Sequence, residues 1–327
     1  MDLSVRIERW PLAEAFTISR GSKTEAVVVV AELCDGTHCG RGECVPYARY
    51  GQTPDGIVAA IEAMRPALEG RLDRAALQAA MPPGAARNAL DCAYWDVNAK
   101  RLGRPVHELA ALVAPEPRVT AYTISLGSPA AMAEAAERAA SRPLLKVKLG
   151  GPGTTDGERI AAVRRAAPNS ELIVDANEGW NEDNLARNLA ACADCGVTLI
   201  EQPLPEGRDA ALSRFKRPVP VCADESVHDR ASLDLLAGKY DAVNIKLDKA
   251  GGLTEALALA AEAERRGLAI MAGCMVSTSL SMAPAMLVAQ RARVVDLDGP
   301  LLLAKDRADG LRYEGSLVYP ADPALWG

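Results

Sequence analysis

Short apolar runs alternate with Ala-rich stretches from about residue 119 to residue 298. A polar residue or a cysteine closes each run, and these ends recur every 22 to 28 residues. Continuous apolar strands separated by helices indicate repeated β-α units of a parallel sheet that is covered on both faces. Eight such runs predict a (β/α)7β barrel of the TIM type. The closing residues are Thr123, Lys148, Asp175, Glu201, Asp224, Lys246, Cys274 and Asp298.

A doubly wound open sheet is the alternative fold for the same pattern. No G-x-G-x-x-G follows the first run, which weakens a dinucleotide-binding interpretation. The segment Gly151-Pro-Gly153, which follows the second run, predicts a turn rather than a phosphate loop. The barrel is therefore the favoured fold.

The first 110 residues have a different pattern. Residues 1–45 contain three runs typical of antiparallel strands with turns between them, and residues 56–109 carry apolar residues at helical spacing. The Pro-rich segment VAPEPRV then marks a boundary. We therefore expect an α+β capping domain over residues 1–113 and the barrel over 114–305. A C-terminal tail over 306–327 is expected to return to the capping domain.

Composition narrows the class of protein. The 37 Lys and Arg against 43 Asp and Glu give a net charge of −6, which argues against a nucleic-acid partner. No apolar run reaches about 18 residues, so no membrane span is expected. The N-terminal MDLSVRIERW carries charges where a signal peptide would be apolar, and we expect a cytoplasmic protein. The sequence leaves open whether the chain forms a homo-oligomer.

The eight cysteines do not form an evident metal site. Cys34, Cys39 and Cys44 lie near His38, and Cys192 and Cys195 form a C-x-x-C. Zinc sites usually combine two closely spaced pairs of ligands such as C-x-x-C, and the sequence offers no second pair. We therefore expect ordinary reduced cysteines rather than zinc ligands or disulfides.

Asp175, Glu201 and Asp224 close three consecutive strands, whose ends meet at one mouth of a barrel. Two like charges about 4 Å apart repel by about 4 kcal/mol at an effective dielectric constant of 20. Such a cluster therefore requires protonation or a cation. Oxygen ligands suit Mg²⁺, and the absence of histidine from these strand ends makes zinc or iron less suitable. The sequence predicts one Mg²⁺ at these three acids.

Lysines complete the predicted site. Lys146 and Lys148 share one face of their strand, and Lys246 lies four strands further, across the mouth. Burial and neighbouring cations lower the pKa of a lysine, which makes it a usable base. Two opposed lysines suit 1,1-proton transfer, in which one removes the proton beside a carboxylate and the other returns it on the opposite face. A metal would stabilise the intervening enolate.

Five motifs, in this order and spacing, resemble the enolase superfamily and its muconate-lactonizing-enzyme subgroup. They are K-V-K, D-A-N-E-G-W, E-Q-P, A-D-E-S and N-I-K-L-D-K-A-G-G. The resemblance covers essentially the whole chain and implies an enolase-like fold. It also implies site roles: Lys148 and Lys246 as the acid/base pair, Asp175, Glu201 and Asp224 as Mg²⁺ ligands, and Lys146 as a group that polarises the substrate carboxylate.

Asp296-Leu-Asp298 resembles the D-x-D with which dipeptide epimerases of this subgroup bind the substrate ammonium. Thr123 resembles a residue that contacts the dipeptide. The segment from Phe16 to Ser22 is similar to the specificity loop over the mouth, where Arg20 would suit a glutamyl carboxylate. The resemblance thus implies an isomerase that inverts the α-carbon of the C-terminal residue of a small dipeptide. L-Ala-L-Glu is the expected substrate, and murein-peptide recycling the expected role.

Two kinds of alternative stay open. Another enzyme of the subgroup could use the same site: an N-acylamino-acid racemase, an o-succinylbenzoate synthase or a cycloisomerase. An N-blocked substrate has no ammonium to pair with Asp296 and Asp298. The other alternative is a catalytically silent, metal-binding barrel, against which the presence of both Lys148 and Lys246 argues.

Overall fold

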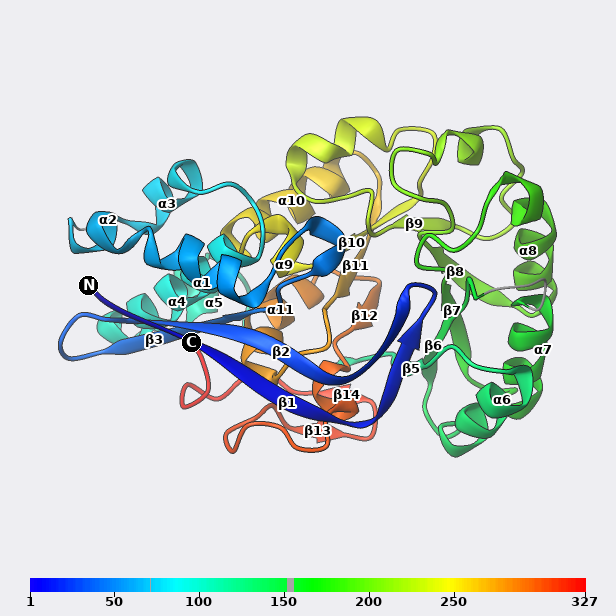
Figure 1. The fold of residues 1–327 in the computed structure, drawn as a ribbon, viewed down its shortest axis with the longest axis horizontal. Helices are drawn as coiled ribbons and strands as arrows, with labels where there is room; N and C mark the ends of the chain where they lie inside the picture. The colour runs from blue at the N-terminus through cyan, green and yellow to red at the C-terminus, as the bar shows by residue number, and fades with distance from the viewer. Residues whose placement is uncertain (71, 152–155) are drawn as a thin grey trace.

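The structure is a computed structural model that describes residues 1–70, 72–151 and 156–327. The turn predicted at Gly151-Pro-Gly153 extends outside the described residues. Figure 1 shows two parts side by side, a layer of long strands with small helices and a barrel of short strands ringed by helices. The barrel carries the functional residues, and one hairpin of the other part reaches it.

The barrel contains eight parallel strands that pair strictly in sequence order. The Ala121 amide donates a hydrogen bond to the Val295 carbonyl at 2.8 Å, which joins the first and last strands and closes the ring. The predicted (β/α)7β barrel is confirmed. Its strands are β5 (Tyr122–Ile124), β6 (Leu144–Lys148), β7 (Glu171–Asp175), β8 (Val197–Glu201), β9 (Val221–Ala223), β10 (Ala242–Ile245), β11 (Ala269–Gly273) and β12 (Val294–Asp296).

The helices between the strands depart from the expected regularity. Two connections contain only short 3-10 helices, η2 (Ala210–Ser213) and η3 (Arg230–Leu235), where the sequence predicted α-helices. The other connections carry α6 (Pro129–Arg138), α7 (Asp156–Ala166), α8 (Glu182–Asp194), α9 (Leu247–Ala250) with α10 (Leu253–Arg265), and α11 (Ser279–Ala289), and η4 (Gly299–Leu302) follows β12. In the described residues, no helix is both long and apolar enough to cross a membrane.

The inside of the barrel has an apolar floor near the N-terminal ends of the strands and a polar mouth at their C-terminal ends. Side chains alternate along each strand, so every second residue points into the barrel. Near the N-terminal ends these inward residues form a small buried apolar cluster that includes Leu144, Ile173 and Leu199. Further along β6, the same inward face carries Lys146 and then Lys148. Charged groups are thus held above a dry floor.

The N-terminal part begins with an antiparallel sheet of β1 (Asp2–Ile18), β2 (Gly21–Cys34) and β3 (Cys39–Cys44). The β1–β2 hairpin is longer than predicted, and its tip reaches the barrel, where the Leu126 amide donates to the Thr17 carbonyl at 3.0 Å. The predicted specificity loop is therefore the tip of a hairpin. Helices follow: η1 (Ala48–Tyr50), α1 (Pro54–Glu62), α2 (Arg65–Glu69), α3 (Arg74–Ala80), the longer α4 (Ala85–Leu102) and α5 (Val106–Leu109).

Helix α4 packs closely on β3 because that strand carries glycines. A Cβ atom at Gly42 would lie 2.0 Å from the Ala89 carbonyl oxygen, and one at Gly40 would lie 2.1 Å from the Val97 nitrogen. The G-R-G spacing places both glycines on the face toward the helix. This close packing fixes the position of the sheet from which the hairpin extends.

The C-terminal segment contacts both parts of the structure. Its strands β13 (Tyr313–Glu314) and β14 (Leu317–Val318) form a small sheet with β4 (Arg118–Val119), which precedes the barrel. Further along, the Trp326 indole N–H donates to the Cys92 carbonyl at 3.0 Å, on helix α4. The tail therefore ends against the helix that supports the N-terminal sheet.

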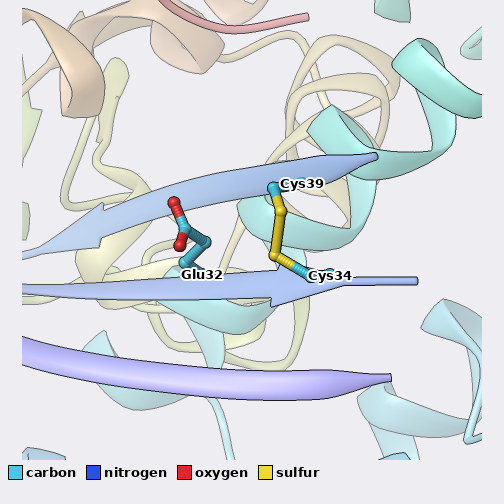
Figure 2. A group of neighbouring side chains, drawn as sticks. All are labelled: Glu32, Cys34 and Cys39. Atoms are coloured by element: carbon cyan, nitrogen blue, oxygen red, sulfur yellow. A yellow bond between two sulfur atoms is a disulfide. The ribbon is translucent and has the colours of Figure 1, made fainter. Parts of the chain in front are cut away.

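The expectation of reduced cysteines is wrong for one pair, because Cys34 and Cys39 form a disulfide. The two residues face each other across β2 and β3, and Glu32 lies beside them (Figure 2). The sequence showed the turn between these cysteines but not the strand register that pairs them. Since the two sulfurs are bonded to each other, they are not thiolate ligands for a metal. The free cysteines are Cys44, Cys92, Cys192, Cys195, Cys222 and Cys274.

A thiol titration tests this pairing. In denaturant without reductant the protein should show six reactive thiols, and after reduction it should show all eight. The Cys34→Ser/Cys39→Ser double variant should show six thiols under both conditions. Eight thiols in the unreduced wild-type protein would contradict the disulfide.

Candidate active site

Three buried acids meet at the mouth of the barrel. Asp175 ends β7, Glu201 ends β8, and Asp224 follows β9, so that each comes from the next strand around the ring. One carboxylate oxygen from each lies within 4.8 Å of the other two. Burial and the negative charge of Asp175 raise the pKa of Glu201 to about 7. The cluster therefore concentrates negative charge where water does not screen it.

Polar neighbours on the same loops orient these three acids. The Asn177 amide donates to Asp175 Oδ1 at 2.9 Å, from a left-handed turn with a φ of 44°. The Asn244 side-chain amide donates to Glu201 Oε1 at 2.7 Å, and the Lys249 ammonium lies 2.5 Å from Asp224 Oδ1. Such contacts limit the rotamers of ligand side chains.

The sequence reasoning assigned no role to Asn177, Asn244 or Lys249. All three occur inside the motifs D-A-N-E-G-W and N-I-K-L-D-K-A-G-G, which carry more polar residues than a strand end and a helix start require. Lys249 is the clearest signal, because it lies on the short helix α9 and is almost fully buried. A buried lysine requires a carboxylate partner.

Two further lysines flank the three acids. The Lys148 ammonium lies 2.6 Å from Asp175 Oδ2, and the Lys246 ammonium lies 2.7 Å from Asp224 Oδ2. Their strands, β6 and β10, are four places apart in the ring of eight, so the lysines stand on opposite sides of the mouth. This is the arrangement that a two-sided proton transfer requires.

The expected lowering of lysine pKa is not found at Lys246. Burial alone would lower it, but the neighbouring carboxylates, above all that of Asp224, hold the pKa of Lys246 above its ordinary value. The sequence argument counted the cations around the mouth and did not pair each one with its nearest carboxylate. A cation bound at Asp224 would offset the charge of that carboxylate and so weaken the effect that holds the pKa of Lys246 up.

Lys146 lies beneath the cluster and connects it with strand β12. Its ammonium is 2.6 Å from Glu201 Oε2, 2.6 Å from Asp296 Oδ2 and 3.3 Å from Asp175 Oδ2. The side chain is fully buried, and these carboxylates keep the pKa of Lys146 well above its ordinary value. Lys146 thus stays charged and holds Asp296 next to the acid cluster.

Asp296 and Asp298 form a second acidic group at the same mouth. The Thr123 amide donates to Asp298 Oδ2 at 2.7 Å, so the structure brings together a residue of the first barrel strand and one that follows the last strand. Burial and the charge of Asp296 raise the pKa of Asp298 to about 6. Among the residues that the structure describes, Asp296 Oδ1 is buried without a hydrogen-bond partner. This oxygen is suited to a donor that a ligand brings.

Arg20 occupies the tip of the β1–β2 hairpin and bonds to the protein. Its guanidinium donates to Glu225 Oε1 and to the Tyr47 hydroxyl, both at 2.6 Å, and to the Asn177 carbonyl at 2.7 Å. Glu178 lies 3.2 Å away. These contacts fasten the hairpin to the loops that follow β7 and β9, an arrangement that sequence spacing alone does not reveal.

The three central acids fit a hard divalent cation. All donors are carboxylate oxygens, they come from three rigid strand ends, and no histidine takes part. Bound to Asp175, Glu201 and Asp224, such a cation would offset the repulsion that raises the pKa of Glu201.

Both parts of the chain match models of known protein families. Residues 1–110 match the mandelate racemase/muconate lactonizing enzyme N-terminal domain, and residues 131–319 match the enolase C-terminal domain-like family. The chain belongs to the enolase superfamily. The resemblance found in its motifs is confirmed.

Individual relatives in this superfamily cover nearly all of the chain. An L-Ala-D/L-Glu epimerase from Escherichia coli is 47% identical over 94% of this chain and 95% of its own. An N-acetyl-D-glutamate racemase from Pseudoalteromonas is 45% identical over 92% of this chain and 95% of its own. A crystal structure from Agrobacterium tumefaciens, described as having homology to dipeptide epimerases, contains sodium and L-Ala-L-Glu. It is 55% identical over 99% of each chain, with a TM-score of 0.97.

Substitution of one acid tests the cation site. The Asp175→Asn variant should bind Mn²⁺ or Mg²⁺ at least about 10-fold more weakly, because it loses an anionic ligand. Isothermal titration measures this without reference to turnover. The Asp183→Asn variant, which changes an exposed acid on α8, serves as the control and should bind as the wild type does. Equal affinity of all three proteins would contradict the assignment of Asp175.

Proposed function

We propose that this protein is a metal-dependent dipeptide epimerase that inverts the α-carbon of the C-terminal residue, with L-Ala-D/L-Glu as its substrate. The observation that carries the proposal is the placement of Lys148 and Lys246 on opposite sides of one carboxylate cluster. Two opposed proton carriers are what inversion of a carbon centre needs. The names of the relatives from E. coli and A. tumefaciens support the same reaction class.

Asp175, Glu201 and Asp224 would hold the cation, for which the all-oxygen donor set favours Mg²⁺. When bound, it would offset the charge of these carboxylates and stabilise negative charge on the substrate carboxylate as the α-proton leaves. Lys146, which contacts Glu201 from below, would add positive charge on the same side. The chain thereby lowers the energy of an enolate, the species that loss of the α-proton produces.

The lysines perform the proton transfer itself. Lys148 would take the α-proton of one diastereomer, and Lys246 would then donate a proton to the opposite face of the planar carbon. In the reverse direction the two residues exchange roles. The neutral lysine accepts and the charged one donates, so each turnover leaves the pair ready for the opposite diastereomer.

Asp296 and Asp298 would bind the free ammonium of the first residue. Asp296 Oδ1 lacks a hydrogen-bond partner in the described part of the chain, and the Thr123 amide fixes Asp298 beside it. A charged donor from the substrate would satisfy the buried oxygen. Thr123 would line this subsite, and Arg20, at the hairpin tip, is retained as a candidate for the side chain of the second residue.

A racemase of N-acetylated glutamate is the second candidate function, because one relative at 45% identity carries that name. Its substrate undergoes the same proton transfer but has no ammonium. The partnerless oxygen of Asp296 favours the dipeptide, since an acetamido N–H brings no positive charge to it. A role in murein-peptide recycling and a cytoplasmic location stay predictions from the sequence.

Single lysine variants test the two-base mechanism. Lys246→Ala should lower epimerisation of L-Ala-L-Glu by about 100- to 10,000-fold, because one proton carrier is missing. It should still exchange the α-proton of the diastereomer that Lys148 serves, and Lys148→Ala should show the converse. NMR in D₂O measures both exchange rates. Lys216→Ala removes an exposed lysine and is the control. Wild-type exchange of both diastereomers by both variants would refute the mechanism.

Blocking the substrate amine tests the ammonium subsite. N-acetyl-L-Ala-L-Glu should have a kcat/KM about 10- to 150-fold below that of L-Ala-L-Glu, because the charged contact to Asp296 is lost. N-acetyl-L-glutamate, measured in parallel, separates the two candidate functions. Preferential turnover of N-acetyl-L-glutamate would make the racemase the better assignment.

A further inference from the structure

The short helix α9 of the barrel packs against helix α4 of the N-terminal part. It begins immediately after Lys246, whose carbonyl accepts the Lys249 amide at 3.1 Å and the Ala250 amide at 3.0 Å. The backbone of Lys246 therefore belongs both to the end of β10 and to the first turn of α9. A shift of α9 would move the Cα atom of Lys246 and with it the ammonium of a proton carrier.

Asp248, the second residue of α9, bonds this helix to the N-terminal part. Its Oδ1 atom accepts hydrogen bonds from the Val45 amide at 3.0 Å and from the Asn88 side-chain amide at 2.9 Å. Asn88 lies on α4, and both Asn88 and Asp248 are buried. Among the described residues no Lys or Arg forms an ion pair with Asp248, and burial raises the pKa of this carboxyl to about 7. Asp248 therefore serves as a hydrogen-bond acceptor between the two parts.

The other end of α9 is bonded to α4 as well. The Arg87 guanidinium donates to the Ala250 carbonyl at 2.8 Å and to the Gly251 carbonyl at 3.0 Å. Gly251 has a φ of 81°, and a Cβ atom there would lie 2.6 Å from Arg87 Nε, so the glycine permits this close approach. Arg87 and Asn88, which are neighbours on α4, thus hold the two ends of the turn that follows Lys246.

The backbone that follows Lys148 is bonded to the barrel instead. The Leu149 amide donates to the Asp175 carbonyl at 2.8 Å, which belongs to the neighbouring strand β7. The two lysines of the proposed proton transfer are therefore held differently. A barrel strand holds the end of β6 at Lys148, whereas helix α4 of the N-terminal part also holds the turn at Lys246.

We propose that Asp248 is a positioning residue that fixes the place of Lys246 through its bonds to Val45 and Asn88. This inference rests on the proposed function. Loss of these bonds would let α9 shift, and a displacement of about 1 Å in a reacting group can cost about 100-fold in rate. Lys148 would keep its place, so the two proton transfers would be affected unequally. The N-terminal part would thereby control one proton carrier without supplying any.

Exchange of the α-proton with D₂O, followed by NMR, separates the two lysines. Exchange in the unconverted starting diastereomer needs only the lysine that serves it, and Lys246→Ala and Lys148→Ala identify which one that is. In Asp248→Ala, exchange of the diastereomer that Lys246 serves should fall at least about 10-fold, and that of the other should change by less than about 3-fold. Epimerisation should fall in both directions, because each direction uses Lys246.

Three further variants separate positioning from a general loss of structure. Asp248→Asn keeps an oxygen that accepts both bonds, and it should exchange both diastereomers within about 3-fold of the wild type. Asn88→Ala removes the donor on α4 and should reproduce the unequal loss in smaller measure. Thr254→Val is the matched control, because the Thr254 hydroxyl donates to Asp91 Oδ1 at 2.6 Å between α10 and α4. Its loss should lower thermal stability without separating the two exchange rates.

Each outcome decides the assignment of Asp248. An equal loss of both exchange rates in Asp248→Ala, or no loss, would overturn it. So would an unequal loss in Thr254→Val, or a failure of Asp248→Asn to retain the exchange that Lys246 serves. If Asp248→Ala does not fold, Asn88→Ala and Asp248→Asn decide on the same criteria. If the dipeptides are inert, the epimerase proposal fails separately and the two enantiomers of N-acetyl-glutamate take their place. A wild type that exchanges none of these compounds would refute both proposals.

Discussion

The repulsion among three buried carboxylates is the constraint on which this structure depends. Two like charges about 4 Å apart repel by about 4 kcal/mol at an effective dielectric constant of 20, and these carboxylates have oxygens within 4.8 Å of one another. The chain offsets this with four buried lysines that each contact at least one of the three acids. The amides of Asn177 and Asn244 add neutral donors. Lys148 and Lys246 each contact one of these acids, so in the proposed mechanism charge balance and proton transfer involve the same residues.

The barrel is what allows so many charges to meet without unfolding the protein. Parallel strands bring their carboxyl ends to a single mouth, and the alternation of side chains sends every second residue inward. The lower inward positions are apolar and buried, so they form a dry floor below the lysines. Because strands β6 to β10 are adjacent in order, the sequence Lys, Asp, Glu, Asp, Lys along the chain becomes the same order around the ring.

The features predicted from sequence are those that this periodicity fixes. The eight strands, the polar residue at each strand end and the opposition of Lys148 and Lys246 follow from repeat length and strand order. Contacts that depend on the register or packing of distant segments do not follow. The Cys34–Cys39 disulfide required the exact pairing of β2 with β3, and the Arg20–Glu225 pair required the hairpin to reach the loop after β9. The lysine pKa was misjudged for the same reason, since each nearest carboxylate comes from another strand.

The two parts of the chain contribute different kinds of group to the mouth. Every residue assigned to proton transfer or to the cation comes from the barrel, where backbone hydrogen bonds on both sides hold each strand. Phe16 and Arg20 come from one hairpin that meets the barrel through contacts at its tip. The residues assigned to proton transfer and the hairpin are thus separate segments of the chain. They meet through side-chain contacts of Arg20 and through a backbone hydrogen bond from the Leu126 amide to the Thr17 carbonyl, so the hairpin is fixed at its tip against the barrel that carries the proposed chemistry.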